Sequence, residues 1–402
     1  MKIAVIGAGA SGLMCAGFLA KKGHDVSVFD GNEKAGKKLY ITGKGRCNFT
    51  NVSFDLDFQK NIVRGEKFLF SALNGFNSED SVSFFEELGM KTKVERGNRA
   101  FPLSDKASDV TKALLKHCED VKFAFNEKVE TIYKKDHFIV TTSKGKYEFD
   151  SVVVATGGSS YKATGSTGDG YRIAKSFGHN IIEIKPALCA IELKDAFIKQ
   201  LQGLSLKNVS LIVKTGKNKI EEFGEMLFTD KGISGPIVLS VSSFINRLEE
   251  VSLCIDFKPR LSKEVLNDRL LREFGEAKNK EIKNIMKNLL PSSLVDVFLG
   301  ECNISASKKV NSVTQAERMH IIEKLKDFQL EFKGLYPLDS AIITSGGVDT
   351  KQINPKTMES KLVEGVYFIG EVLDIDALTG GYNLQLAFST AVACARSFKE
   401  VR

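Results

Sequence analysis

Residues 2–12 read KIAVIGAGASG, and this stretch decides the fold. Its apolar run, Lys2 to Ile6, predicts a strand buried on both faces, and the glycines that follow predict a tight turn into a helix from about Ser11 to Lys22. A second strand is expected over Asp25 to Phe29, directly before Asp30. A strand, a glycine turn, a helix and a second strand within about thirty residues form the βαβ unit of a doubly wound α/β sheet, the Rossmann-like class.

Three glycines of this stretch have separate physical tasks. Gly7 permits the tight turn after the strand, Gly9 lets the backbone approach a pyrophosphate, and Gly12 allows the helix to pack closely on the strand. The first turn of the helix then offers free N–H groups and the positive end of its dipole to an anion. Asp30 follows Gly9 by about twenty residues, where a carboxylate accepts hydrogen bonds from an adenosine ribose. Together these features predict a dinucleotide site, in preference to a glycine-rich turn without a ligand.

Two further glycine loops decide between NAD and FAD. Residues 155–158 read ATGG after an apolar run, and Gly370-Glu371 follows a second apolar run near the other end of the chain. An NAD dehydrogenase usually completes its dinucleotide domain in one continuous block. Here strands from both ends of the chain are expected in one sheet around a large insertion, and this arrangement favours FAD.

The start of the last helix is a second candidate anion site. Residues 379–383 read TGGYN and open a helix expected from about Asn383 to Phe398. Glycines before a helix leave its first N–H groups free, and a flavin gains negative charge at N1 and O2 when it is reduced. We therefore expect this helix to stabilise the reduced cofactor. The alternative is an ordinary capped helix after a loop.

Residues 36–51 hold the candidate catalytic groups. The stretch combines three glycines and four basic residues with one cysteine and two asparagines, which suits an anion-binding loop. Cys47 follows Arg46, so a lowered thiol pKa and a role as general acid or nucleophile are expected. The alternative is a Cys47 that only packs beside the cofactor. Arg46 and Asn48 are expected as binding residues, with Arg46 as a second catalytic candidate.

The composition is that of a globular protein with more than one domain. The chain has 402 residues, of which 43% are hydrophobic and 27% are charged, values that argue against a disordered chain. Its formal net charge of +7 is compatible with an anionic cofactor, an anionic substrate or nucleic acid. Seven scattered cysteines without a C-x-x-C pair argue against a disulfide framework and fit a reducing cytosol. No metal site and no membrane span are expected, so the protein is predicted to be soluble and cytoplasmic.

The pattern of the sequence also shows where one module interrupts another. Short alternating strands over residues 121–154 predict a meander that returns the chain to the parallel sheet. Residues 190–255 have antiparallel strand patterns, and residues 262–325 are helical in pattern and rich in lysine. This change marks an insertion from about Pro186 to Leu335. Its stretch 278–287 is expected as a solvated helix face, with nucleic-acid contact left open.

Five motifs in this order resemble those of the BaiN/RdsA-type (YhiN-like) flavoproteins, a family that includes aminoacetone oxidase-like proteins. The motifs lie at residues 38–51, 155–170, 224–236, 344–348 and 370–385. The resemblance implies an FAD-binding domain of the two-dinucleotide-binding-domain type, interrupted by a β-barrel-like domain and a small helical domain. The implied boundaries are 1–185 with 336–402 for the FAD domain, 186–261 with 325–335 for the barrel-like domain, and 262–324 for the helical domain.

The resemblance also implies which residues contact FAD, with NAD(P)H as the reductant. Carried over onto this sequence, they are Gly7, Gly9, Ala10, Ser11, Gly12, Asp30, Lys38, Leu39, Gly45, Arg46, Cys47, Asn48, Val129, Ala155, Thr156, Gly157, Gly370, Glu371, Gly381, Tyr382, Asn383 and Leu384.

The expected activity is hydride transfer from NAD(P)H through FAD to an activated C=C bond. Substrates linked to the family include steroid-like compounds, uridine in ribosomal RNA and aminoacetone, and we favour uridine in 23S rRNA because a basic chain suits a polyanion. The alternatives are a small-molecule reductase, an amine oxidase that uses oxygen, and a flavin-bearing RNA-binding protein without turnover. The sequence does not decide between NADH and NADPH, or the oligomeric state.

Overall fold

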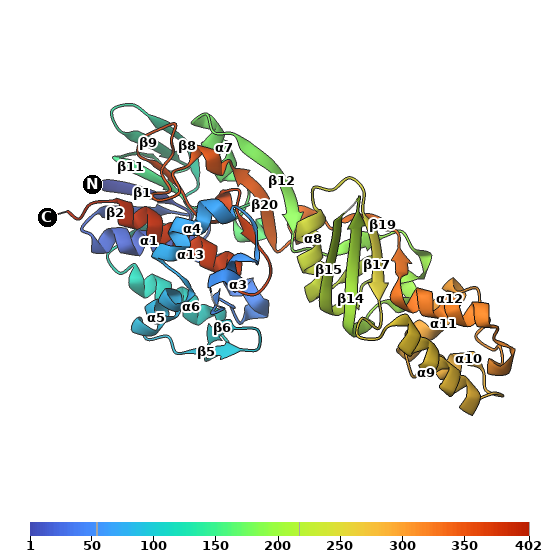
Figure 1. The fold of residues 1–402 in the computed structure, drawn as a ribbon. Helices are drawn as coiled ribbons and strands as arrows, with labels where there is room; N and C mark the ends of the chain where they lie inside the picture. The colour runs from blue at the N-terminus through green and yellow to red at the C-terminus, as the bar shows by residue number, and fades with distance from the viewer. Residues whose placement is uncertain (54, 217, 402) are drawn as a thin grey trace. The chain divides into compact units, whose positions relative to one another are not determined.

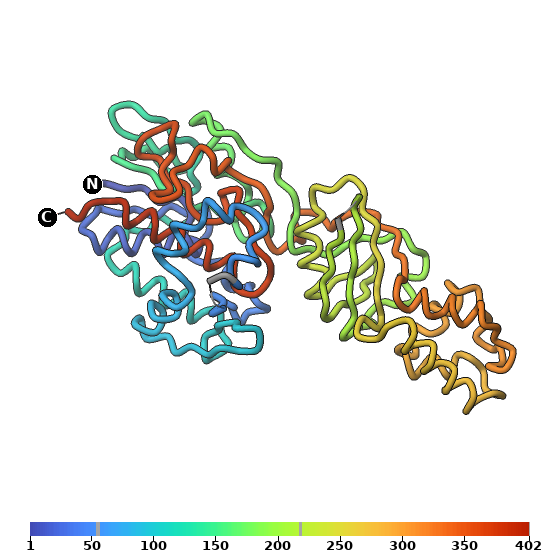
Figure 2. The backbone as a smooth tube through the Cα atoms, viewed as in Figure 1, coloured from blue at the N-terminus to red at the C-terminus, as the bar shows by residue number. Residues whose placement is uncertain are grey.

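The computed structural model describes residues 1–53, 55–216 and 218–401. The chain forms two compact units. One, which we call the Rossmann unit, consists of Met1–Ala187 and Pro337–Arg402, and the other, the inserted unit, is Leu188–Tyr336. Figure 2 follows this division along the backbone: the blue N-terminal and red C-terminal segments belong to one unit, and the green-to-orange middle of the chain forms the other.

A five-stranded parallel sheet forms the centre of the Rossmann unit (Figure 1). Ile6 is in register with Phe29 of one neighbouring strand and with Val154 of the other, so the carboxyl ends of the three strands meet at one edge. The residues that leave this edge are those of the predicted glycine loops. In sheet order the strands are β21 (Val366–Phe368), β11 (Ser151–Val154), β1 (Lys2–Ile6), β2 (Asp25–Phe29) and β7 (Lys122–Ala124).

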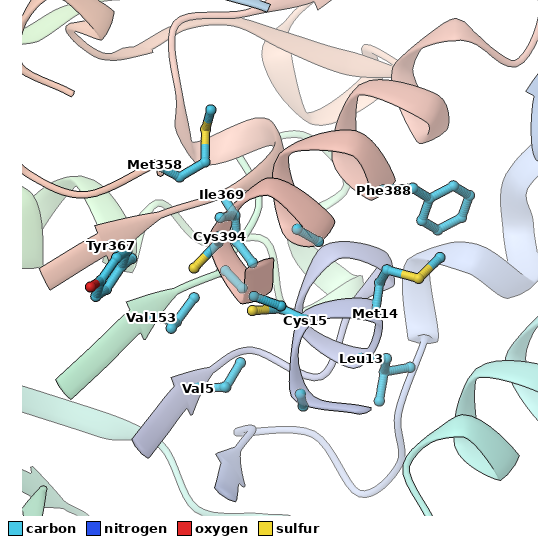
Figure 3. Packing of buried hydrophobic residues seen from close by; sticks show 14 of the residues in the cluster. Val5, Leu13, Met14, Cys15, Val153, Met358, Tyr367, Ile369, Phe388 and Cys394 are labelled. Carbon is cyan, nitrogen blue, oxygen red and sulfur yellow. The ribbon is translucent and has the colours of Figure 1, made fainter. Parts of the chain in front are cut away.

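Two helices from opposite ends of the chain pack together in this unit. They are α1 (Ala10–Lys21) and α13 (Tyr382–Ser397). Figure 3 shows Cys15 of α1 and Cys394 of α13 side by side among apolar side chains of the sheet, and both are fully buried. Because apolar burial is the main stabilising term in folding, this contact joins the two ends of the chain into one core. The predicted βαβ unit is confirmed, and both ends of the chain contribute to the Rossmann unit.

The remaining elements of the Rossmann unit surround this centre. The predicted meander is present as three antiparallel strands, β8 to β10. The other strands are β3 (Thr50–Asn51), β4 (Ile62–Arg64), β5 (Thr92–Glu95), β6 (Arg99–Pro102), β8 (Val129–Lys134), β9 (Phe138–Thr142), β10 (Lys146–Phe149), β12 (Ile181–Ala187), β20 (Ile343–Val348) and β22 (Asp376–Ala377). The other helices are α2 (Lys37–Ile41), α3 (Asp55–Gln59), α4 (Glu66–Gly75), α5 (Ser78–Glu87), α6 (Ala107–His117) and α7 (Asp169–Ser176), with a short 3-10 turn, η7, at Gly370–Val372.

A seven-stranded antiparallel sheet forms much of the inserted unit. Its order is β18-β17-β14-β15-β16-β13-β19. The two edge strands β18 and β19 follow one another in the chain with only Glu331 between them, so the edges of the sheet come together and the sheet curls in a barrel-like way. The strands are β13 (Ile191–Leu193), β14 (Ser205–Thr215), β15 (Asn218–Phe228), β16 (Gly232–Ser234), β17 (Ser252–Asp256), β18 (Phe328–Leu330) and β19 (Phe332–Leu335).

Four helices lie at one end of this sheet within the inserted unit (Figure 1). They are α9 (Lys263–Glu276), α10 (Ile282–Met286), α11 (Ser292–Glu301) and α12 (Gln315–Lys326), and a fifth helix, α8 (Pro236–Ile245), follows β16. Buried residues from the sheet and from α9 to α12 belong to one hydrophobic cluster. The division of the insertion into separate barrel-like and helical domains stays a prediction. None of the helices in the described ranges combines the length and apolar character needed to cross a membrane.

Candidate functional site

The N-terminus of α1 is open to a ligand. Its N-cap residue Gly9 has a φ of −85°, and no side chain among the described residues caps the helix. A Cβ added at Gly9 would meet no atom within 4 Å. A Cβ added at Gly12 would instead lie 1.9 Å from the carbonyl oxygen of Gly7. The glycine at position 12 is therefore required by packing within the protein, whereas the backbone at position 9 and the first N–H groups of α1 are free to approach a pyrophosphate.

The carboxylate of Asp30 lies beside this glycine loop. Its Oδ2 accepts a hydrogen bond from the backbone N–H of Ala8 at 2.8 Å. Its Oδ1 accepts from the backbone N–H and the side-chain amide of Asn32, at 2.8 and 2.9 Å. These bonds fix the carboxylate at the end of β2. Oδ2 keeps a further lone pair for a ribose hydroxyl, whereas Asn32 uses both lone pairs of Oδ1.

The N-terminus of α13 is also uncapped by any described side chain. Its N-cap residue Gly381 has a φ of 98°, a left-handed conformation that favours glycine. A Cβ at this position would lie 2.4 Å from the carbonyl oxygen of Thr50 and 2.8 Å from Oδ1 of Asn48. The start of the last helix is thus in close contact with residues 48–50, as expected if both belong to one site.

Asn48 and Asn383 use their amides differently. Oδ1 of Asn48 is buried and has no hydrogen-bond partner among the described residues, and such an atom costs free energy unless a ligand or water satisfies it. Asn383 accepts a bond from the backbone N–H of Ala377 at 2.9 Å and donates to the carbonyl oxygen of Ala377 at 2.7 Å. Its side chain therefore fastens β22 to α13, which leaves the backbone of Asn383 as the group able to contact a cofactor.

Lys38 connects three segments that lie far apart in the sequence. Its Nζ donates to Oε2 of Glu371 at 2.7 Å and to Oγ of Ser160 at 2.8 Å. Glu371 also accepts a bond from the backbone N–H of Thr344 at 2.9 Å. The side chains of Lys38 and Glu371 are 26% and 22% exposed, so this is a partly desolvated ion pair, stronger than one at an open surface. It joins α2 to η7.

Arg46 is held by carboxylates of the protein. Its Nε donates to Oδ1 of Asp105 at 2.9 Å, its Nη2 donates to Glu95, and its guanidinium stacks on the ring of Phe101 with 4.3 Å to the ring centre. Hydrogen bonds to Glu95 and Asp105 raise the pKa of Arg46. Lys93 lies 2.6 Å from Asp105 and completes a four-membered ion network. The guanidinium thus fastens residues 42–48 to β5 and β6.

The surroundings of Cys47 do not lower the pKa of its thiol, contrary to the prediction from the neighbouring Arg46. The residue is fully buried, and burial raises the pKa of its thiol to about 12. The expectation of a lowered pKa and of a nucleophilic thiolate is therefore wrong, because Arg46 is directed to Glu95 and Asp105 and desolvation dominates at the sulfur. Cys47 also has a φ of 57°, an uncommon backbone conformation for a residue with a side chain.

The other predicted contact residues lie at the ends of these same elements. Gly370 contacts both α1 and α13. Its N–H donates to Oγ1 of Thr390 in α13 at 3.0 Å, and a Cβ added at Gly370 would lie 2.6 Å from Oγ of Ser11 in α1. The first residues of α1 are Ala10 and Ser11, and the first turn of α13 contains Tyr382 and Leu384. Leu39 is buried in α2, and Gly45 follows in the next loop. Val129 begins β8, and the residues directly after β11 are Ala155, Thr156 and Gly157.

Several residues of this region were not predicted as site residues. Ser160 and Thr344 lie within motifs that carried the family resemblance, so those motifs contained a signal for them. Glu95 and Asp105 lack any such signal, since their link to Arg46 appears only when β5 and β6 fold against the loop. All seven cysteines are free and buried, and in the described part of the chain no group of three or more His, Cys, Asp or Glu side chains is placed to hold a metal ion.

Comparison with known proteins gives the family. A family model described as "HI0933-like protein Rossmann domain" matches residues 1–397. The chain belongs to this family. It is a flavin-dependent oxidoreductase, and the predicted resemblance and fold class are confirmed.

Curated relatives of this HI0933-like protein match it over nearly the whole length. A ribosomal RNA dihydrouridine synthase from Haemophilus influenzae is 33% identical, over 98% of this chain and 97% of the relative. A 3-dehydro-bile acid delta(4,6)-reductase from Clostridium scindens is 29% identical, over 99% of both chains. Among solved structures, a 3-ketosteroid-delta4-(5alpha)-dehydrogenase from Rhodococcus jostii matches with a TM-score of 0.51 at 12% identity, over 98% of this chain and 96% of the other, which shows similarity of fold.

The residues of this HI0933-like protein fit FAD, the cofactor that the family implies. Gly9 leaves space at the first N–H groups of α1, Asp30 is fixed beside them, and α13 presents a second uncapped N-terminus. The unpartnered Oδ1 of Asn48 adds a buried acceptor at that second end. A long dinucleotide with an anionic pyrophosphate and a ring that gains negative charge matches these two positive helix ends.

Proposed function

We propose that this protein passes hydride from NAD(P)H through FAD to the activated C=C bond of uridine in 23S rRNA, which gives dihydrouridine. The observation that carries the choice of substrate is the full-length similarity to a relative named ribosomal RNA dihydrouridine synthase. The geometry supports the choice of cofactor, because two uncapped helix N-termini from opposite ends of the chain belong to one unit.

The chain's own residues would hold the cofactor in a fixed order. The N–H groups of Ala10 and Ser11 would bind the pyrophosphate, and Asp30 would accept hydrogen bonds from the adenosine ribose. The first turn of α13 would face the end of the flavin ring that becomes negative on reduction. Bound FAD supplies two-electron hydride transfer, which reduction of a C=C bond requires. The ion pair of Lys38 and Glu371 would keep α2 and η7 in place around it.

The proton that completes the reduction needs a donor. The sequence points to Cys47 for this role. Its thiol carries a proton at neutral pH, but complete burial and a pKa raised to about 12 make it a weak acid, so a Cys47→Ala variant tests this role against a packing role. A fixed, strained backbone at this residue fits a functional group, since such conformations concentrate at active sites. Arg46 would then act as a positioning residue, since Asp105 and Glu95 occupy its guanidinium and the three groups hold the loop that carries Cys47.

A small electron-poor alkene is the second candidate substrate. The relative from Clostridium scindens, named a bile acid delta(4,6)-reductase, matches the chain over its full length at nearly the same identity as the RNA enzymes. The chemistry would be the same reduction of a conjugated C=C bond, with a different binding surface for the substrate.

Activity assays with purified holoenzyme distinguish the two candidate substrates. We expect the enzyme with NADPH to convert uridine to dihydrouridine in protein-free 23S rRNA that lacks the modification, detected as the gain of two hydrogens by mass spectrometry. We also expect a strain without the gene to lose dihydrouridine from its 23S rRNA. Unchanged rRNA in both experiments would refute the proposal, and turnover of a steroid-like enone under the same conditions would establish the second candidate.

A further inference from the structure

The helical end of the inserted unit brings two lysine-rich segments side by side. Residues 277–284 read AKNKEIKN, and residues 305–312 read SASKKVNS. They run antiparallel, with a β-bridge between Glu281 and Lys309. We call these two segments the lysine cluster. The first segment follows α9 and includes the start of α10, and the second lies between α11 and α12, so tertiary structure joins residues that the sequence separates.

The lysine cluster is anchored to the core of its unit. The N–H of Ile282 donates to the carbonyl oxygen of Lys308 at 2.9 Å, and the N–H of Val310 donates to that of Lys280 at 3.0 Å. Ile282 and Val310 are both buried. The polar side chains of the two segments therefore extend from a fixed backbone, and a ligand that binds them does not have to order the chain first.

The charge of the lysine cluster is strongly positive. It contains five lysines against one acidic residue, Glu281, which pairs with Lys283 at 3.0 Å. Lys308 pairs with Glu317 of α12 at 2.6 Å, so three of the five lysines remain outside these two pairs. Lys278, Lys280 and Lys309 are exposed. Within the described part of the chain, Lys278 and Lys280 have no carboxylate within 4 Å.

Three lysines on strands of the same unit offer a contrast. Each lies within 3.4 Å of a carboxylate: Lys214 with Asp327, Lys219 with Glu221, and Lys333 with Glu192. These paired lysines provide a comparison of equal charge for the exposed lysines of the cluster.

We propose that the lysine cluster binds the phosphodiester backbone of the RNA substrate. This inference rests on the proposed function, because it assigns the surface by which the protein holds that RNA. Lysine, asparagine and serine are the side chains that contact phosphate and sugar, and the two segments consist mainly of these residues. Neither segment contains an aromatic residue on which a base could stack, so contact with the backbone is expected and sequence readout is not.

RNA fits this surface better than an acidic protein does. A stable protein interface has an apolar centre, and the apolar residues of the cluster, Ile282 and Val310, are turned into the core. A polyanion needs no such centre, because it gains affinity mainly by releasing condensed counterions when lysines neutralise its phosphates.

The test compares two triple variants of the full-length holoenzyme that lose the same charge. One is Lys278→Ala/Lys280→Ala/Lys309→Ala, and the control removes the three paired lysines, Lys214→Ala/Lys219→Ala/Lys333→Ala. Affinity for protein-free 23S rRNA lacking dihydrouridine is measured over a range of KCl concentrations. We expect the cluster variant to bind about tenfold or more weakly, with a log–log salt slope less steep by about 2. The control is expected to bind like the wild type, and in both variants NADPH should reduce the bound flavin at the wild-type rate.

Three results would overturn the inference: equal RNA affinity of the two variants, no measurable binding of rRNA by the wild type, or tighter binding of poly-glutamate than of RNA through the same lysines. The proposed function fails separately. If the wild type binds rRNA through the cluster but forms no dihydrouridine, the RNA-binding role of the cluster is supported and the proposed reaction is refuted. If dihydrouridine forms and both variants have the same KM for rRNA, the proposed reaction is supported and the lysine cluster is not the RNA-binding surface.

Discussion

Nζ of Lys38 lies 2.7 Å from Oε2 of Glu371, although 333 positions separate the two residues in the chain. The pair connects α2, which follows β2, to η7, which follows β21 of the parallel sheet. It is one of the contacts that join segments from both ends of the chain within the Rossmann unit. Around it lie the elements to which FAD contacts were assigned.

Breaking this pair is expected to weaken both the fold and cofactor binding. Lys38→Met leaves Glu371 as a partly desolvated negative charge where an anionic cofactor is expected, so we predict a loss of about 1–2 kcal/mol in unfolding free energy and weaker FAD binding. The double variant Lys38→Met/Glu371→Gln should be more stable than the sum of the single effects predicts, because neither charge remains unpaired. Additive effects in thermal and urea unfolding would show that the pair makes no direct contribution.

Two neighbouring glycines should respond differently to the same substitution. Gly9→Ala places a methyl group in open space, so the apoprotein should melt within a few degrees of the wild type while FAD affinity falls by roughly tenfold. Gly12→Ala places it 1.9 Å from the oxygen of Gly7, so the apoprotein itself should lose several kcal/mol of stability. Melting temperatures of the apoproteins and FAD titration measure both effects. Equal loss of stability in the two variants would contradict the assignment of Gly9 to the ligand.

Stability should fall in mildly acidic solution because of one buried histidine. His117 packs between the rings of Phe18 and Phe84, and burial lowers the pKa of its imidazole to about 4. The unfolded chain binds this proton near pH 6.5, so stability is fully present above that pH and is lost as the pH falls from about 6.5 to 4, by up to about 3 kcal/mol. We expect His117→Leu to remove the contribution of His117 to this pH dependence in unfolding experiments, while His24 and His179, whose pKa values burial also lowers, keep theirs. The exposed His137→Gln is the control, and an unchanged pH profile in His117→Leu would contradict the prediction.

Replacement of Cys47 should slow reduction of the substrate by the reduced flavin, and it should not slow reduction of the flavin by NAD(P)H. If its thiol donates the proton to the substrate, Cys47→Ala will reduce FAD with NAD(P)H at the wild-type rate and will oxidise the reduced flavin with substrate at least about a hundredfold more slowly. Wild-type Cys47 should also resist alkylation of the native protein at neutral pH, since it is buried and protonated. Normal turnover of Cys47→Ala would show that Cys47 is only a packing residue.

The parts of the fold with a strong local pattern were predictable from the sequence. The strand Lys2–Ile6 and the glycines after it were identified because β-branched residues and a fixed glycine spacing report local structure. The last helix was placed within one residue, at Tyr382–Ser397, because its apolar residues recur at helical spacing.

Other features depend on contacts that no local pattern reports. The helix Pro236–Ile245 is a short, mainly apolar segment with three serines, and a short apolar segment does not distinguish a buried helix from a buried strand. Arg46 is bound by Asp105 and Glu95, which lie about fifty residues further along the chain, and Cys47 is buried. Because Arg46 is directed away from Cys47, their adjacency in the sequence predicts a lowered thiol pKa where the structure has a raised one. The pairing of these side chains depends on the tertiary fold, and their adjacency in the sequence does not predict it.

The most direct test of the account follows the flavin through both half-reactions without oxygen. NADPH or NADH is added to the purified holoenzyme, excess nicotinamide is removed, and protein-free 23S rRNA lacking dihydrouridine is then mixed with the reduced enzyme. We predict that the flavin absorbance is bleached by the nicotinamide and returns on addition of this rRNA, with one dihydrouridine formed for each flavin reoxidised. A flavin that stays reduced with the rRNA and is reoxidised only by oxygen would contradict the account.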